Sequence, residues 1–313
     1  MKHHGFYYHP SFLNHDTGPG HPERPERLKA LMNHLLKSPV WNKLDHLQPS
    51  PANRESIHLV HPEEHVTMIE KRCKRGERIL NSGDTLVCDQ SFDIALVAAG
   101  GVVEAVEKVM EGTLANAFCA IRPPGHHAET STVMGFCLLN NIAVGARFAQ
   151  KKFGVERVAI VDWDVHHGNG TQEIFYEDDS VLYVSLHQYP FYPGTGAKDE
   201  RGRGQGEGFT LNIPMSAGSG EKEYIEAFDA EIIPKLNAFR PELVMISAGF
   251  DAHRDDPLAQ INLTEHSYAL FTEKIREVAE RHCGRRIVSV LEGGYNLEAL
   301  ARSVEKHLEA LVV

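Results

Sequence analysis

Carboxylate and imidazole side chains cluster in residues 158–171, which read VAIVDWDVHHGNGT. This stretch opens with the apolar, β-branched residues typical of a buried strand and then changes to Asp162, Asp164 and His166. Because alternate side chains of an extended chain share a face, these three can point in one direction. Carboxylates and an imidazole that converge at a strand end suit a divalent metal ion, zinc above all. The alternative is a polar strand exit whose carboxylates only bind nearby backbone amides.

Three further polar clusters, around His126, Asp251 and Tyr295, each follow directly after a predicted strand. These strands are short apolar runs over residues 118–121, 243–248 and 287–291. In an open parallel sheet, ligands bind outside the carboxyl ends of the strands. We therefore expect these clusters and the one around Asp164 to meet at one edge of the sheet.

Predicted strands alternate with predicted helices along most of the chain. Further strands are expected over residues 5–9, as an aromatic edge strand, and over 158–163, 181–186 and 209–213. Helices are expected to start near Pro25, Lys222 and Thr264 and to cover 91–112, 142–153, 171–176 and 297–312. This alternation predicts an α/β fold with a mainly parallel sheet and helices on both faces. Because no Pro/Ser-rich linker interrupts it, residues 1–313 are predicted to form a single domain.

Composition excludes several classes of function. The chain has 313 residues and a formal charge of −11, without a Lys/Arg run, so direct binding to nucleic acid is not expected. No apolar run approaches the roughly 18 residues of a membrane span, and the first residues lack the apolar core of a signal peptide. The five cysteines show neither metal-type nor redox-type spacing. These features predict a cytoplasmic protein with reduced thiols.

Six stretches of the sequence resemble the zinc-dependent histone deacetylase family, which also contains bacterial acetylpolyamine amidohydrolases. They read RPPGHHAE, GFCLLNN, VDWDVHHGNGT, SLHQYPFYPGTG, SAGFDAHRDDPL and LEGGYN, and they follow one another in family order. The similarity extends from the HPERPERL loop to the end of the chain. Asn169 and the LEGGYN motif look more like class II members than class I, in which an aspartate is usual at the Asn169 position. The resemblance implies the arginase/deacetylase-like fold and a hydrolase that removes acetyl or other short acyl groups from amines, with acyl-lysine as the first choice.

The resemblance also implies a catalytic metal site. One zinc ion would be held by three ligands: Asp164, His166 and Asp251. Three protein ligands leave an open position on zinc, as in catalytic sites. Zinc in such a site polarises a carbonyl group and lowers the pKa of water.

A tandem histidine pair and one tyrosine would complete the catalytic residues. We interpret His127 as the general base and then the general acid that protonates the leaving amine. His126, held by Asp162, would remain protonated and act by its charge. Asn169 adds no negative charge, which favours a neutral His127. Tyr295 would donate a hydrogen bond to the developing oxyanion.

Two further features follow from the resemblance alone. A structural K⁺ or Na⁺ would be bound by Asp162, Ser185 and backbone carbonyls around Asp164, His166 and Leu186. A narrow substrate channel would be lined by Gly135, Phe136, Tyr192 and Leu258. Leu258 follows an Asp-Pro pair at a position where one branch of polyamine-selective relatives has a glutamate.

Three alternatives remain open. An acetylpolyamine deacetylase would use the same chemistry on a cationic amine. A binuclear-metal ureohydrolase shares the fold class but would require further Asp/His ligands in place of the tandem histidines and Tyr295. A non-catalytic acyl-binding protein would be expected to lack one of the catalytic residues, and all are present. The expected partner is an acylated lysine side chain or a small acylated amine as substrate. The sequence is compatible with a monomer or an oligomer.

Overall fold

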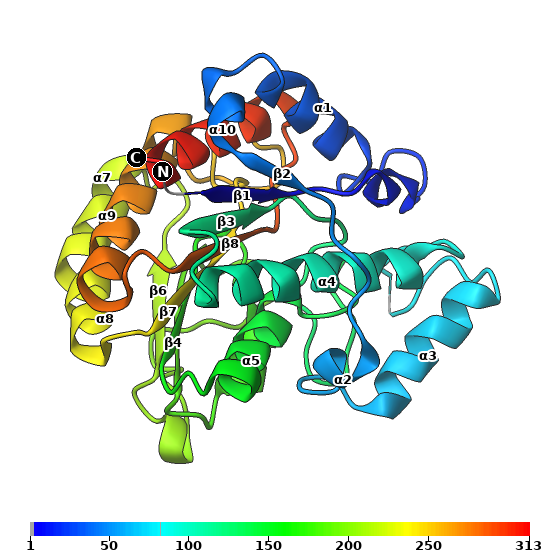
Figure 1. Cartoon of the computed structure of the whole chain (residues 1–313), viewed down its shortest axis with the longest axis horizontal. Coiled ribbons are helices and arrows are strands. Elements are labelled where there is room, and N and C mark those ends of the chain that lie inside the picture. Colours follow the sequence, from blue (N-terminus) through cyan, green and yellow to red (C-terminus); the bar gives the residue numbers. More distant parts are fainter. Residues whose placement is uncertain (1–2, 82) are drawn as a thin grey trace.

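Within residues 3–81 and 83–313, which the computed structural model describes, eight parallel strands form one sheet (Figure 1). In chain order the strands are β1 His4–Tyr7, β2 Asp45–Leu47, β3 Asn116–Cys119, β4 Val158–Asp162, β5 Val181–Gln188, β6 Thr210–Met215, β7 Leu243–Ala248 and β8 Ile287–Leu291. Their order in the sheet is β2-β1-β3-β8-β7-β4-β5-β6. The strands β8, β7 and β4, which precede three of the polar clusters, are therefore direct neighbours at the centre of the sheet.

Helices cover both faces of the sheet, with α4 and α5 on one side and α1, α10, α9, α8 and α7 on the other (Figure 1). The α-helices are α1 Glu26–Leu35, α2 Arg54–Ile57, α3 Glu63–Lys74, α4 Ser91–Met110, α5 Asn141–Phe153, α6 Asn169–Phe175, α7 Glu221–Ala227, α8 Ile233–Phe239, α9 Glu265–Cys283 and α10 Leu297–Leu311. A π-helical turn over Phe228–Ile232 joins α7 to α8. None of the helices in the described ranges combines the length and the apolar character that crossing a membrane requires.

The central strands form because their residues are apolar and rich in β-branched side chains. Every residue of β4, β7 and β8 is buried, as expected of parallel strands that helices cover on both faces. The observed bounds of β7 and β8 equal those predicted from the sequence. The predicted single-domain α/β architecture, with a mainly parallel sheet and helices on both faces, is thus confirmed.

The prediction that the first strand lies at the sheet edge is wrong. β1 pairs with β2 on one side and with β3 on the other, so β2 forms the edge. The three residues of β2 read Asp-His-Leu, too few and too polar for an apolar strand pattern. The helices α2 and α3, which lie between β2 and α4, are also absent from the prediction.

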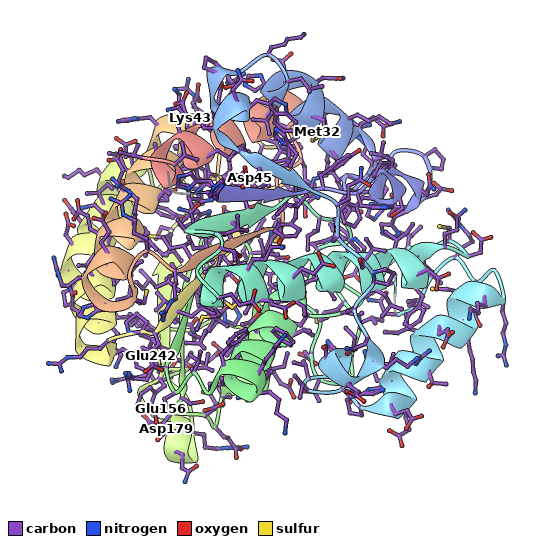
Figure 2. The ribbon with its side chains drawn as sticks, in the orientation of Figure 1. Met32, Lys43, Asp45, Glu156, Asp179 and Glu242 are labelled. Carbon is purple, nitrogen blue, oxygen red and sulfur yellow. The ribbon has the colours of Figure 1, made fainter. Side chains whose placement is uncertain are left out.

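The two ends of the sheet differ in character. Glu156, Asp179 and Glu242 precede β4, β5 and β7, and Figure 2 shows them together at one end of the molecule. The Glu242 carboxylate accepts hydrogen bonds from the backbone amides of Glu156, at 2.7 Å, and of Arg157, at 3.1 Å. Glu242 therefore stabilises the start of β4, whereas the candidate catalytic residues follow the strand ends.

Candidate active site

The candidate active site lies at the carboxyl edge of the sheet, where β8, β7 and β4 are adjacent. The chain bends after β4 through Asp164 and His166, whereas Asp251 follows β7 and Tyr295 follows β8. His127 belongs to the long loop after β3. Because β3 pairs with β8, this loop also reaches the same edge.

Asp164, His166 and Asp251 form a buried group whose ligand atoms all lie within 4.8 Å of one another. Nδ1 of His166 is 3.1 Å from Oδ1 of Asp164 and 3.1 Å from Oδ2 of Asp251. These are the three predicted zinc ligands. Two carboxylate oxygens and one imidazole nitrogen are ligand types that catalytic zinc sites use.

The electrostatics of this group fit a bound cation. Burial raises the pKa of Asp251 to about 7, and the negative charge of Asp164 contributes to the rise. Burial opposes protonation of His166, but its hydrogen bonds with both carboxylates outweigh burial and raise its pKa to about 10. The two carboxylates can both ionise easily only when positive charge lies between them. A Cβ atom at Gly293 would collide with the Asp251 carboxylate. A glycine at this position therefore allows the backbone after β8 to lie close to that carboxylate.

Asp162 does not join the group, contrary to the expectation that Asp162, Asp164 and His166 face one way. Because β4 ends at Asp162, the alternation of side chains in an extended strand does not continue to Asp164 and His166. Asp162 Oδ2 instead lies 3.0 Å from Nδ1 of His126 and accepts a hydrogen bond from the Tyr183 hydroxyl at 3.1 Å. Asp162 therefore lies behind the histidine pair.

The two histidines of the pair have opposite electrostatic surroundings although their ring centres are 4.0 Å apart. Burial opposes protonation of His126, but the carboxylates of Asp162 and Asp164 outweigh it and raise its pKa to about 10. Burial lowers the pKa of His127 well below its ordinary value, and the positive charge of His126 lowers it further. Nδ1 of His127 lies 2.8 Å from the side-chain oxygen of Asn169. The protein therefore raises the pKa of one ring of the pair and lowers the pKa of the other.

Two buried charged residues outside the predicted site hold its loops together. The Glu292 carboxylate accepts hydrogen bonds from the backbone amides of Gly125, at 2.7 Å, and His126, at 3.2 Å. Arg27 donates to the backbone oxygens of Gly294, at 2.7 Å, and Glu292, at 2.5 Å. The sequence around Arg27 predicts only the start of α1, and nothing in it indicates a contact so distant along the chain.

A pocket of about 300 Å³ opens above the metal-ligand group. Its lining residues are Asp84, His127, Gly135, Phe136, His166, Phe191, Tyr192, Leu258 and Tyr295. All four predicted channel residues are among them. Asp84 and Phe191 are not in the predicted set, although Phe191 is adjacent to Tyr192 in the sequence and lies within the quoted motif.

Aromatic rings form much of the pocket wall. Phe191 stacks on His166 with ring centres 5.5 Å apart, and Phe136 meets Tyr295 edge to face at 6.1 Å. The hydroxyl of Tyr192 donates a 2.7 Å hydrogen bond to Asp84, which brings the segment before α4 to the pocket. The result is a mainly apolar pocket whose lining also includes the polar side chains of His127, His166 and Tyr295.

The residues of the predicted monovalent-cation site lie at the end of β4 and in the interior of β5. Asp162 and Ser185 are register partners on these strands, and both are fully buried. Leu186, whose backbone carbonyl belongs to the same predicted site, follows directly on β5. The Ser185 hydroxyl also lies 2.9 Å from Nδ1 of His187.

Comparisons with known proteins agree with this geometry. The model of the histone deacetylase domain matches residues 21–311. A probable deacetylase of Archaeoglobus fulgidus is 45% identical over 296 residues, which cover 94% of this chain and 82% of that protein. A histone deacetylase-like amidohydrolase of Pseudomonas aeruginosa is 41% identical over 278 residues, which cover 88% of this chain and 73% of that protein.

A solved structure extends the similarity to three dimensions. The crystal structure of the HDA15 HD domain superposes with a TM-score of 0.94 at 39% sequence identity, and covers 99% of this chain and 88% of that one. The shared fold, the domain match across the chain and the similarity to deacetylases lead to one conclusion. This protein belongs to the histone deacetylase family.

Proposed function

We propose that this protein is a zinc-dependent amidohydrolase that removes acetyl or other short acyl groups from acylated lysine side chains. One observation carries the proposal. A narrow apolar pocket of about 300 Å³ ends at His127, His166 and Tyr295, beside the metal-ligand group. A slim alkyl chain that carries an amide at its tip matches this combination of apolar walls and polar end.

Asp164, His166 and Asp251 would hold one zinc ion, which when bound polarises the acyl carbonyl and lowers the pKa of water. A structural K⁺ or Na⁺ would be held by Asp162 and Ser185 together with backbone carbonyls. The buried pairing of Asp162 with Ser185 across β4 and β5 supports that second site.

The residues of this chain would move the protons. Nε2 of His127 would take a proton from the attacking water and return one to the amine nitrogen as the C–N bond breaks. His126, kept protonated by Asp162, would stabilise negative charge without exchanging protons. The hydroxyl of Tyr295 would donate a hydrogen bond to the oxyanion. The products are a carboxylate and a free amine.

Acetylpolyamine hydrolysis is the second candidate, and one observation favours it. Asp84 lines the pocket and could attract a cationic amine. Its Oδ2 atom, however, already accepts hydrogen bonds from the Tyr192 hydroxyl, at 2.7 Å, and from the Gly135 amide, at 3.2 Å. Leu258, the other wall residue that bears on this choice, is apolar. We therefore rank acyl-lysine first.

A binuclear ureohydrolase has less support. Among residues 3–81 and 83–313, a single cluster of His, Cys, Asp or Glu has metal-binding geometry, and it offers three ligands. Two adjacent metal ions would require more Asp or His ligands than these three.

A panel of substrates tests the proposal. The zinc-loaded protein is incubated with acetyl-lysine peptides, longer acyl-lysine peptides, acetylputrescine and acetylspermidine, and kcat/KM is measured for each. We expect the highest kcat/KM for an acyl-lysine peptide. The absence of hydrolysis across the whole panel would overturn the proposed activity.

A further inference from the structure

The carboxylate of Asp256 binds three backbone amides from two different walls of the site. Its Oδ2 atom accepts hydrogen bonds from the amides of Tyr295, at 2.7 Å, and Asn296, at 3.2 Å. Its Oδ1 atom accepts one from the amide of Leu258, at 3.0 Å. The residue is 6% exposed, so these bonds are shielded from water. Hydrogen bonds to an ionised acceptor are roughly twice as strong as neutral ones.

These three contacts join the segments that carry the chemistry. Asp256 belongs to the same loop as the metal-ligand residue Asp251, and it precedes the pocket residue Leu258. Tyr295 comes from the loop after β8. The Asp256 side chain therefore connects the loop after β7, which carries Asp251 and Leu258, to the loop after β8, called here the tyrosine loop, which carries Tyr295.

The tyrosine loop has other restraints, which act on its side chains and on the backbone before Tyr295. The Arg27 guanidinium lies over the Tyr295 ring, 5.1 Å from its centre, and the Asn296 side chain donates to the backbone oxygen of Asp255 at 3.0 Å. Arg27 donates to the backbone oxygens of Glu292 and Gly294, and the Gly293 amide donates to Asp164 at 2.8 Å. The amide of Tyr295 itself donates to Asp256. The position of the tyrosine backbone therefore depends directly on this carboxylate.

A helix cap is the competing explanation, because an acidic group near a helix N-terminus stabilises the helix. The start of α10, however, already has its own cap. The side chain of Asn296 accepts a 3.0 Å hydrogen bond from the amide of Ala299. Capping alone would not require a second residue that also binds Leu258.

We propose that Asp256 is a positioning residue for the reaction, one that places the Tyr295 hydroxyl against the oxyanion and sets the position of Leu258 at the channel. The inference rests on the proposed function. A displacement of about 1 Å at a reacting group can cost about 100-fold in rate. The effect of Asp256 on kcat should therefore pass through Tyr295, whereas its effect on KM should pass through Leu258.

A double-mutant cycle tests this pathway. Asp256→Ala and Asp256→Asn are made in the otherwise unchanged protein and in Tyr295→Phe, and kcat and KM are measured with an acetyl-lysine peptide alongside zinc content. We expect Asp256→Ala to lower kcat by about 10- to 100-fold in the first background and by less than about threefold in the second. KM should rise in both. Asp256→Asn, whose single carbonyl oxygen cannot serve both sides, should fall between wild type and Asp256→Ala.

Asp255→Asn is the matched control. It removes the same charge at the preceding residue, whose carboxylate pairs with Arg302 and accepts no hydrogen bond from the Tyr295 amide. We expect kcat within about twofold of wild type, because a half-exposed ion pair contributes little.

The outcomes separate the inference from the proposed function. Equal losses of kcat in both backgrounds, or a normal kcat in Asp256→Ala, would overturn the positioning role while hydrolysis by wild type left the function intact. A normal kcat in Tyr295→Phe would also overturn it, because no step would then remain for Asp256 to support. If Asp256→Ala does not fold, Asp256→Asn provides the same comparison. A wild-type protein that hydrolyses no acyl substrate overturns both together.

Discussion

Nδ1 of His127 lies 2.8 Å from the side-chain oxygen of Asn169, and this bond determines which ring nitrogen can accept a proton. The amide nitrogen of Asn169 donates to the carboxylate of Glu129 at 2.9 Å, so the oxygen must face the ring. An amide oxygen only accepts hydrogen bonds. The hydrogen of neutral His127 is thus assigned to Nδ1 from the surrounding hydrogen bonds, and Nε2 keeps its lone pair.

Replacing Asn169 tests this assignment. We expect Asn169→Ala to lower kcat by about 10- to 100-fold, because the ring loses the acceptor that selects its tautomer. Asn169→Asp keeps an acceptor and should retain more activity than Asn169→Ala. The measurement is kcat with an acetyl-lysine peptide at constant zinc content. A near-normal kcat in Asn169→Ala would contradict the tautomer argument.

The roles of His127 and Tyr295 make a second prediction. His127→Ala and Tyr295→Phe should each lower kcat by at least about 100-fold, because one removes proton transfer and the other the oxyanion donor. Neither residue belongs to the metal-ligand group, so bound zinc should be unchanged. Steady-state kinetics and elemental analysis of the same samples give both readouts. Normal turnover in either variant would remove that residue from the mechanism.

Metal content makes a third prediction. We expect one zinc ion per chain, loss of activity in a chelator and recovery when zinc is restored. Asp251→Ala should lose both zinc and activity, because it leaves one carboxylate and one imidazole. Asp255→Asn, which changes a nearby carboxylate outside the group, should keep both. Two metal ions per chain, or an active and zinc-loaded Asp251→Ala, would refute a three-ligand site.

The central fold was predictable because its strands are continuous apolar runs. β7 and β8 begin and end where the apolar pattern does, and Gly154 and Gly284 end helices α5 and α9 as left-handed residues. The edge strand β2 was not predictable, because three residues with one apolar side chain carry no periodicity. Its place depends on pairing with β1, a contact between distant parts of the chain.

The same distinction applies to the site. The candidate ligands and catalytic residues stand in motifs directly after strands, so local sequence is enough to propose them. Asp84, Arg27 and Glu292 are different, because each acts through a partner far along the chain. Asp84 binds Tyr192, for example, across 108 residues. No local pattern encodes such contacts, and only the packed structure reveals them.

Buried histidines make a fourth prediction, about stability. Burial lowers the pKa of His15 to about 4, of His61 to about 4 and of His307 to about 3. Unfolded, each would titrate near about 6.5, so below that pH the unfolded chain binds protons that the folded chain does not. The contribution of these three histidines to the free energy of unfolding should therefore be highest above about pH 6.5. Each histidine should lower it by about 1.4 kcal/mol per pH unit as the pH falls toward its folded pKa.

Urea unfolding from pH 8 to pH 5 measures this dependence. His307→Gln removes one of the three groups. Its free energy of unfolding should therefore fall less steeply with acidification than that of wild type, by about 1.4 kcal/mol per pH unit, which corresponds to the uptake of one proton. The same pH dependence in His307→Gln and in wild type would mean that His307 is not held neutral in the folded protein.

Substrate choice makes the last prediction, and two wall residues bear on it. Leu258 and Asp84 both line the pocket, one apolar and one acidic. Asp84 is not among the predicted channel residues, and it places a carboxylate in a wall where Leu258 is apolar. Its Oδ2 atom, however, accepts two hydrogen bonds within the protein, which reduces its attraction for an incoming cation.

We therefore expect kcat/KM to be higher for acyl-lysine peptides than for acetylspermidine. Leu258→Glu adds a carboxylate without such partners and should shift the ratio toward acetylspermidine by about fivefold, since a solvated ion pair contributes about 1 kcal/mol. Leu258→Gln, similar in size but neutral, should leave the ratio near its original value, which separates charge from shape. The formal charge of −11 attracts cations at long range but selects weakly between two substrates. A tenfold preference of the unmodified protein for acetylspermidine would show that Asp84 outweighs Leu258 and would make the polyamine the better assignment.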